Sequence, residues 1–321
     1  MQPLFFYFKN NDLEIVTLNG QLELENRPVV TVGMFDGVHI GHRKLLSELV
    51  RRAKENGCKS VVMTFDRHPQ HVLANGKTDL KILQNNAERF DKIASTGVDY
   101  LCVLHFTDGF AHLLPSEFLD RMKQSLDPQL VLLGYDNRFG RKNSSEFDEI
   151  LAAGHYGDIL VQRTDSCVFC NSIEVSSTQI RKALERGEVD LANRMLGSNY
   201  VLSGRVVEGN RIGRQLGFPT ANLKVEELKL IPAKGVYAVM VSVDNRLMKG
   251  MLSIGTRPTL GLEDLSVEVN IFGFSQQIYN KTVSVEFIEY IRSEKKFGSL
   301  EQLKQQLCRD RDEAERILAC V

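Results

Sequence analysis

Two histidines with three-residue spacing lie in a glycine-rich stretch, a pattern that could serve phosphate chemistry. The run Gly33–His42 reads GMFDGVHIGH and follows the apolar stretch Val29–Gly33. Glycines let a backbone approach a phosphate closely, and the free N–H groups at a helix N-terminus attract an anion. Two imidazoles at this spacing could donate hydrogen bonds to a phosphoryl group while negative charge builds on it. The run therefore predicts a phosphate-binding loop that carries His39 and His42.

The same histidines could instead bind zinc. His68 and His71 form a second pair with the same spacing, and four imidazoles can complete a zinc site. The chain has no HExxH pattern, and no cysteine pair lies in the glycine-rich loop. A strand, a loop and a helix in succession favour phosphate, and zinc stays as the alternative.

A second polar run, SSTQIR over Ser176–Arg181, is expected to open a helix. Ser176 is the expected N-cap, with Gln179 three residues further on. Ser177 and Thr178 then lie in the first turn, where a phosphate could dock, and Arg181 could hold that phosphate. An ordinary capped helix with a solvated arginine is the alternative.

A third run, GNRIGRQLGFPTANL over residues 209–223, combines glycines with a turn fixed by Pro219. It lacks the GxxxxGK[ST] pattern of a P-loop. If the chain after Pro219 is extended, Thr220 and Asn222 face the same side. A hydroxyl and an amide oxygen on one face could complete the shell of Mg²⁺ bound to ATP phosphates. A plain surface loop is the alternative.

The first half of the chain has the periodicity of an α/β fold. Apolar runs at Ser60–Phe65, Tyr100–Leu104 and Leu130–Leu133 are candidate buried strands. From His42 to Asn56 the apolar residues recur at helical spacing. Strands that alternate with helices predict a mainly parallel sheet, covered on both faces, with ligands at the carboxyl ends of its strands.

The second half changes to the period of an antiparallel sheet or small β-barrel. Val236–Val243, Val267–Phe272 and Val283–Ile288 alternate or run apolar, with turn residues between them. A terminal helix is expected after Ser299, in a capping box with Gln302. We therefore divide the chain into domains of residues 1–182 and 183–321.

Composition excludes several classes of protein. The 321 residues include 40 Lys+Arg and 41 Asp+Glu, and neither half has the basic excess of a nucleic-acid binder. No apolar stretch approaches the ~18–20 residues of a membrane span. Six cysteines are too few for a disulfide framework, so we expect a reducing cytoplasm. We expect a monomer or weak homo-oligomer that binds no nucleic acid and no membrane.

The three runs together carry a family resemblance. GxFDGxHxGH resembles the signature of HxGH nucleotidylyltransferases, and SSTQIR resembles their element for ATP phosphates. GRQLGFPTAN closely resembles the riboflavin kinase signature. That resemblance continues through KGVYAV, SIGTRPT, VEVNIF and IRSEKKF. Over nearly its whole length the chain is similar to the bifunctional prokaryotic riboflavin kinase/FAD synthetase family.

The resemblance implies two reactions that use ATP and Mg²⁺. A C-terminal antiparallel barrel with a terminal helix would transfer the γ-phosphoryl group of ATP to riboflavin. An N-terminal Rossmann-like HxGH domain would join the resulting FMN to AMP from a second ATP and release pyrophosphate. Riboflavin, FMN and ATP are the implied small-molecule partners, and flavins are both substrate and product.

The resemblance also assigns roles to residues. Glu268 is the implied base of the kinase, on a strand whose alternation turns Glu268 and Asn270 to one face. His39, His42 and Arg181 would stabilise the adenylyl transfer, and Thr220 and Asn222 would bind the metal. The implied flavin-binding residues are His68, Pro69 and Arg292. The implied nucleotide-binding residues are Gly33, Phe35, Asp36, Gly37, Gly41, Asp136, Ser176, Ser177, Thr178, Gly213, Arg214, Gly217 and Pro219.

Some positions depart from the family pattern, and two other functions stay open. The departures are Arg67, Asn137, Ser253, Asn270, Gly273 and Asn280. A flavin carrier with a decayed site, or a nucleotidylyltransferase for another acceptor, are the alternative functions. The pair Cys167 and Cys170 forms a lone CxxC, which we interpret as packing cysteines.

Overall fold

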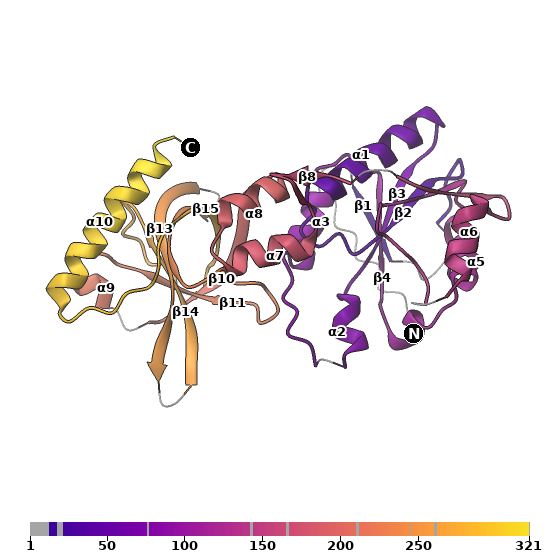
Figure 1. The fold of residues 1–321 in the computed structure, drawn as a ribbon. Coiled ribbons are helices and arrows are strands. Elements are labelled where there is room, and N and C mark those ends of the chain that lie inside the picture. The colour runs from indigo at the N-terminus through magenta and orange to yellow at the C-terminus, as the bar shows by residue number, and fades with distance from the viewer. Residues whose placement is uncertain are drawn as a thin grey trace. The chain divides into compact units, whose positions relative to one another are not determined.

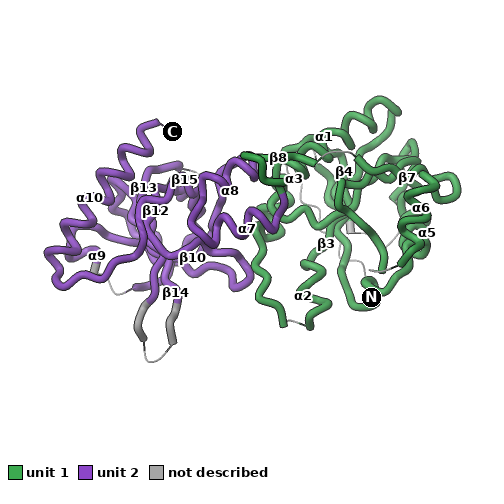
Figure 2. Tube along the Cα trace, viewed as in Figure 1, with its two compact units in different colours: residues 1–175 green, residues 176–321 purple. Residues whose placement is uncertain are grey.

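The computed structural model describes residues 13–17, 22–75, 77–141, 144–164, 167–209, 212–244, 246–259 and 262–320. The chain folds into two compact units, residues 1–175 and 176–321 (Figure 2). The domain boundary that we expected from the sequence lies seven residues after this division.

Within the described residues, unit 1 contains a seven-stranded sheet in the order β1-β4-β3-β2-β5-β7-β6, which is parallel except for β6 (Figure 1). Its strands are β1 (Glu14–Thr17), β2 (Val29–Val32), β3 (Ser60–Phe65), β4 (Tyr100–Leu104), β5 (Leu130–Leu133), β6 (His155–Tyr156) and β7 (Ile159–Arg163). The helices are α1 (Ile40–Glu55), α2 (Pro69–Leu73), α3 (Asn86–Ala94), α4 (Asp108–Ala111), α5 (Pro115–Leu126) and α6 (Glu146–Ala153). A hairpin of β8 (Phe169–Cys170) and β9 (Ile173–Glu174) ends the unit.

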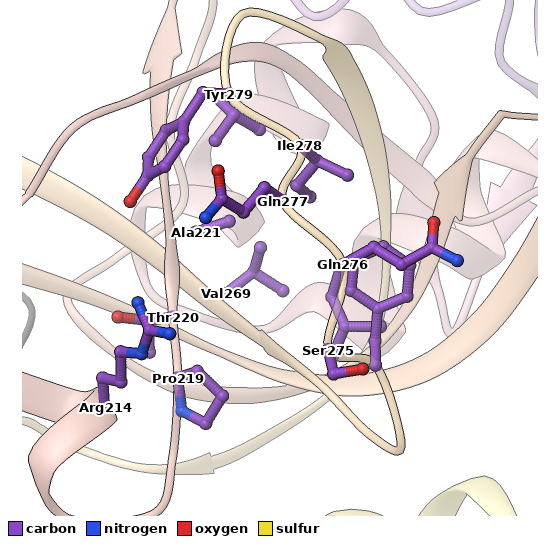
Figure 3. A pocket seen from close by; sticks show the side chains of 13 residues that line it. Arg214, Pro219, Thr220, Ala221, Val269, Ser275, Gln276, Gln277, Ile278 and Tyr279 are labelled. Atoms are coloured by element: carbon purple, nitrogen blue, oxygen red, sulfur yellow. The ribbon is translucent and has the colours of Figure 1, made fainter.

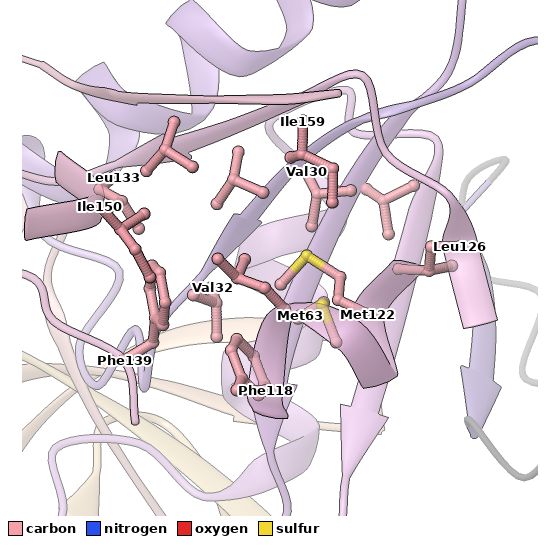
Figure 4. Close-up of a cluster of buried hydrophobic side chains, with 14 of the residues drawn as sticks. Val30, Val32, Met63, Phe118, Met122, Leu126, Leu133, Phe139, Ile150 and Ile159 are labelled. Atoms are coloured by element: carbon pink, nitrogen blue, oxygen red, sulfur yellow. The ribbon is translucent and has the colours of Figure 1, made fainter. Parts of the chain in front are cut away.

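Both faces of this sheet are buried, which explains why its central strands read as unbroken apolar runs. On one face, side chains of β2 and β3 pack against α5 and α6, around Phe118 and Met122 (Figure 4). On the other face, α1 and α3 contribute Leu46, Leu49 and Ile93 to a second cluster. The two clusters fix the carboxyl ends of β2 and β3, and the glycine-rich loop follows β2.

Unit 2 begins with two short helices and continues into a closed barrel. Its helices are α7 (Ser177–Glu185), α8 (Val189–Leu196), α9 (Ile212–Gln215) and α10 (Leu300–Leu318). Its strands are β10 (Tyr200–Val207), β11 (Ala221–Val225), β12 (Gly235–Val243), β13 (Arg246–Thr259), β14 (Leu262–Ile271) and β15 (Thr282–Arg292). The barrel order is β10-β11-β14-β13-β12-β15, closed by pairing of β15 with β10.

The terminal helix α10 is fastened to the barrel by an ion pair. The Arg292 guanidinium, at the end of β15, donates to both carboxylate oxygens of Asp310, at 2.7 and 2.6 Å. Asp310 is 1% exposed and also accepts a hydrogen bond from Gln306. Ser299 caps the helix by accepting from the Gln302 backbone N–H. The expected capping box is wrong in its second half, because the Gln302 side chain accepts from Gly298 instead of Ser299.

The predicted fold class is confirmed in both halves: a parallel α/β sheet, then an antiparallel barrel with a terminal helix. The strands β3, β4 and β5 have the predicted bounds. β14 and β15 run further than predicted, because long strands are needed to pair across the barrel. Among the described residues, no helix is long and apolar enough to cross a membrane.

Removing the carboxylate of Asp310 should destabilise unit 2. Asp310→Asn leaves the Arg292 charge largely buried and without its partner, which costs about 3 kcal/mol of unfolding free energy. Glu313→Gln on the same helix is the matched control, since its exposed pair with Arg316 is worth under ~1 kcal/mol. Urea unfolding followed by circular dichroism compares the two variants, and equal effects would contradict the assignment.

Candidate active sites

The glycine-rich loop brings its two histidines into contact at the start of α1. His39 is the N-cap, and its Nδ1 accepts the backbone N–H of His42 at 3.3 Å. The two rings stack with centroids 3.6 Å apart and planes 16° from parallel. Because Nδ1 of His39 is an acceptor, its Nε2 carries the proton. His39 and His42 lie at the N-terminus of α1, where the helix macrodipole favours an anion.

Burial keeps this pair neutral. Burial lowers the pKa of His39 from 6.5 to about 4. Burial, together with the neighbouring His39, lowers the pKa of His42 well below its usual value. The Nδ1 atom of His42 is buried and has no hydrogen-bond partner among the described residues. At neutral pH the pair offers N–H donors to a ligand instead of fixed positive charges.

The backbone of the loop adopts conformations that most residues avoid. Phe35, Gly37 and Val38 have φ angles of 52°, 89° and 38°. Positive φ is unusual for a β-branched residue, so the fold must impose it at Val38. Phe35 and Val38 are both buried in the core of unit 1. A side chain at Gly41 would lie 3.2 Å from the His39 ring, which explains the glycine there.

Asp36 lies beneath the loop and is 2% exposed. Its carboxylate accepts the backbone N–H groups of Leu83, at 3.0 and 3.1 Å, and of Gln84, at 3.1 Å. These contacts tie the loop to the segment that precedes α3. The carboxylate that sequence reasoning assigned to nucleotide binding is thus hydrogen-bonded to backbone.

Sequence reasoning missed Arg89, which lies 1% exposed under the same loop. Its guanidinium donates to the backbone carbonyls of Met34 and Phe65, and to the Asn86 side chain. Burial lowers the Arg89 pKa to about 10, and nearby Asp36 works against that shift. A single arginine in a helix gives no signal in the sequence that it will be buried.

An aromatic pocket of about 460 Å³ opens at the carboxyl ends of β2, β3 and β4. The phenylalanines that line this aromatic pocket are Phe65, Phe106, Phe110, Phe118 and Phe139. Gly33 and Pro69 line it, and Pro69 begins the helix α2 that His68 caps. Asn137 departs from the family pattern, and its side-chain amide donates a hydrogen bond to the Val32 backbone carbonyl at the end of β2. The wall thus combines flat apolar rings with several polar side chains, two of them arginines, and such a lining suits a flat ligand with a charged group.

The SSTQIR run opens a helix, α7, as predicted. This helix belongs to unit 2, whereas our division of the sequence placed the run in the first domain. Ser176 is its N-cap and accepts the Gln179 backbone N–H at 3.3 Å. Ser177 and Thr178 lie in its first turn, and Arg181 is 9% exposed. Asp136, by contrast, lies exposed in unit 1 after β5. The histidine pair belongs to unit 1, and the SSTQIR run belongs to unit 2.

The alternatives based on zinc and on cysteine redox chemistry find no support in the described residues. No group of three or more His, Cys, Asp and Glu side chains is placed to hold a metal there. His68 Nδ1 instead accepts from Gln70, and His71 Nε2 contacts the Leu80 carbonyl. Cys167 and Cys170 are both free thiols; Cys170 lies on β8, and Cys167 lies two residues before that strand.

In unit 2 the barrel places Thr220 and Glu268 in contact. The Thr220 hydroxyl donates to Oε2 of Glu268 at 3.0 Å, and Asn222 lies opposite Glu268 in the β11–β14 pairing. The Asn270 amide donates to the Pro219 carbonyl at 2.7 Å, which holds the turn before Thr220. The sequence prediction that these oxygen donors share one face therefore agrees with the pairing of the strands.

Glycines shape the turn that leads to this site. A side chain at Gly213 would lie 2.3 Å from the Phe218 carbonyl oxygen, so only glycine lets the turn close. Gly217 has a φ of 85°, in the left-handed region. A side chain at Gly209 would lie 2.1 Å from the Asn222 amide nitrogen. Asn210 and Arg211 of the same run lie outside the described residues.

A barrel pocket of about 290 Å³ extends from Thr220 across β11 and β14 (Figure 3). Arg214, Pro219 and Thr220 line one end, and Gln277 and Tyr279 line the other. No acidic side chain lines this cavity in the described part of the chain. Arg292, which the resemblance assigns to flavin binding, is held by Asp310 at the end of β15.

The buried His39 should make folding pH-dependent. The unfolded imidazole takes a proton near pH 6.5, but the folded one only near pH 4. Stability is therefore full above pH 6.5 and falls as the pH drops through this window. Between pH 7 and 5 this group alone removes about 2 kcal/mol.

His39→Asn keeps a good N-cap residue and should lose about 2 kcal/mol less stability than the wild type over that pH range. Urea unfolding by circular dichroism at pH 7 and 5 measures the difference. His155→Asn, at an exposed position, is the control. If His39→Asn lost as much stability as the wild type, His39 would not be the titrating group.

Two family models match the chain, FAD synthetase over residues 22–179 and riboflavin kinase over residues 196–318. Curated relatives described as bifunctional riboflavin kinase/FMN adenylyltransferase include one from Bacillus subtilis, 34% identical over 92% of this chain and 93% of its own length. Another, from Escherichia coli K12, is 36% identical over 88% of this chain and 90% of its own length.

A crystal structure described as a macrolide-efflux protein from Streptococcus pneumoniae is also similar. It is 33% identical, with a TM-score of 0.83, over 94% of this chain and 98% of that chain. Both family models match in the order in which the two units occur, and the curated relatives are similar over nearly the whole chain. The chain therefore belongs to the bifunctional riboflavin kinase/FMN adenylyltransferase family.

Proposed function

We propose that unit 2 phosphorylates riboflavin to FMN and that unit 1 adenylylates FMN to FAD. The contact between Thr220 and Glu268, at the end of a pocket that also holds Arg214, is the observation that carries the kinase assignment. The stacked His39 and His42 at the N-terminus of α1 support the adenylyl-transfer assignment. Each reaction would use its own ATP.

In the kinase reaction, Glu268 would accept the proton of the riboflavin 5′-hydroxyl as its oxygen attacks the γ-phosphorus of ATP. The bond from that phosphorus to the β-phosphate oxygen breaks, and ADP leaves. Phosphoryl transfer depends mainly on positioning and on charge stabilisation. Arg214 at the same end of the barrel pocket would hold ATP phosphates. Gly213, Gly217 and Pro219 would act by shaping the turn that positions Thr220.

The residues around Glu268 suit Mg²⁺. The Thr220 hydroxyl, the Asn222 amide and the Glu268 carboxylate are hard oxygen ligands, which Mg²⁺ prefers. A glycine at 209 leaves the Asn222 amide directly against the backbone, which holds it in place. We propose that Thr220 and Asn222 hold Mg²⁺ that arrives with ATP. When bound, the ion would neutralise charge on the phosphates.

In the adenylyl transfer, a phosphate oxygen of FMN would attack the α-phosphorus of ATP, and pyrophosphate leaves. No protein nucleophile is required. The neutral imidazoles of His39 and His42 would donate hydrogen bonds to oxygens on which negative charge builds. Gly33, Phe35, Gly37 and Gly41 would shape the loop around them.

Asp36 would act as a positioning residue, because its carboxylate fixes the glycine-rich loop to the backbone of residues 83–84. The SSTQIR element would bind ATP phosphates through Ser176, Ser177 and Thr178, with Arg181 behind them. The FAD synthetase family model extends to residue 179, which supports assigning those three residues to adenylyl transfer. Asp136, after β5, would lie near the nucleotide.

The aromatic pocket of unit 1 would take the flavin ring of FMN. Pro69 lines this pocket, and His68 caps the short helix that Pro69 begins. In unit 2, Arg292 would contact riboflavin while Asp310 holds its guanidinium. We further propose a cytoplasmic monomer or weak homo-oligomer with no nucleic-acid partner.

Glu268→Gln should lower FMN formation from riboflavin by about 10²–10⁴-fold, because the amide cannot accept the hydroxyl proton. Formation of FAD from supplied FMN should stay unchanged. Chromatography of flavins over time, with ATP and Mg²⁺ present, measures both reactions. Glu289→Gln, at an exposed position on β15, is the control. A variant that phosphorylates riboflavin at the wild-type rate would remove Glu268 from its role as base.

His42→Asn should lower FAD formation and spare FMN formation, the opposite of Glu268→Gln. Loss of a preorganised donor should slow FAD formation from FMN by about 10²–10³-fold, with riboflavin phosphorylation kept. His155→Asn serves again as the control. Wild-type protein that forms no FAD from FMN, but adenylylates another phosphate, would point to a different acceptor. Wild-type protein that binds flavin without turnover in either assay would support a flavin carrier.

A further inference from the structure

The barrel pocket has two chemically different ends. At one end lie Arg214 and Thr220, the latter in contact with Glu268. At the other end Gln277 and Tyr279, from the segment after β14, face Ala221 of β11 (Figure 3). A cation and a hydroxyl suit phosphates, whereas the far end offers apolar surface, one ring and one carboxamide. A nucleoside triphosphate has the same polarity, with charge at one end and a flat base at the other.

Gln277 is the polar group that would meet a base docked in this orientation. Its carboxamide points toward Ala221 and Tyr279, while the neighbouring Gln276 side chain extends the other way (Figure 3). Gln277 is exposed, so a docked base would replace water at its amide. A carboxamide offers an acceptor oxygen and two N–H donors, and can pair with a purine edge through two hydrogen bonds.

Among the described residues, no hydrogen bond fixes which way the Gln277 amide faces. A half-turn about its last bond exchanges donor and acceptor. Adenine presents a 6-amino donor beside a ring-nitrogen acceptor, and hypoxanthine presents a 6-oxo acceptor beside a ring N–H donor. A freely turning carboxamide can match either pair, whereas a fixed donor or acceptor matches one.

We propose that Gln277 reads the purine edge of the phosphoryl donor and accepts both 6-amino and 6-oxo purines. This proposal rests on the proposed kinase function of unit 2 and goes beyond it, because it assigns donor selectivity to one residue. Because Gln277 would contact the base and no reacting atom, replacing it should raise KM for the nucleotide and leave kcat unchanged.

The test measures riboflavin phosphorylation by the full chain with ATP and with ITP. Wild-type kcat/KM values for the two donors should agree within about tenfold, since either loses no hydrogen bond to Gln277. Gln277→Leu removes both hydrogen bonds and should raise KM for both donors about tenfold, with kcat unchanged. Gln305→Leu, at an exposed position on α10, is the matched control and should leave both KM values near wild type.

Two further readouts make the result decisive. FAD formation from FMN, which would occur in unit 1, should be equal in all three proteins, and thermal unfolding should show that the barrel is intact. Wild-type discrimination against ITP of more than about 100-fold, or unchanged KM values in Gln277→Leu, would overturn the proposal while the kinase assignment stands. Absence of FMN with either donor would overturn both together.

Discussion

The guanidinium of Arg89 holds together the edge of unit 1 on which its chemistry depends. It bonds the carbonyls of Met34 and Phe65, which follow or end the adjacent strands β2 and β3. Where the parallel strands end, backbone carbonyls no longer have N–H partners on the neighbouring strand, so buried ones need donors from elsewhere. An arginine can serve several at once because its donors form a rigid fork. The loop that carries His39 and His42 departs from the same place, so its shape depends on these bonds.

In the barrel, strand pairing and close turns position the proposed reacting groups. Glu268 lies between β11 and β13 in the sheet, and both neighbours fix its backbone. Thr220 and Pro219 reach it from a turn that closes only because Gly213 has no side chain. In both units, then, the proposed reacting groups lie on rigid elements, and hydrogen bonds hold them there. Such preorganisation favours transition-state stabilisation, since little needs to move when charge develops.

Local patterns were sufficient to predict the fold class, the main strands and the N-caps Ser176 and Ser299, because these depend on neighbours in sequence. The bonds that tie distant segments together could not be predicted in that way. Asp36 reaches Leu83, and Arg292 reaches Asp310, and nothing near either residue in the sequence indicates its partner. The motifs identify which residues matter, but a buried carboxylate such as Asp36 acts through backbone it holds, which only the folded chain reveals.

The composition of the aromatic pocket has an optical consequence. Oxidised flavins lose their fluorescence when a nearby tyrosine or tryptophan gives an electron to the excited ring, and phenylalanine is too hard to oxidise to do so. The chain has no tryptophan, and the aromatic side chains of the described pocket wall are phenylalanines with one histidine. A flavin seated there would stay emissive, whereas FAD quenches itself when its adenine stacks on the flavin ring. FAD bound there in an extended form would thus fluoresce more strongly than released FAD, in which the adenine and flavin rings stack.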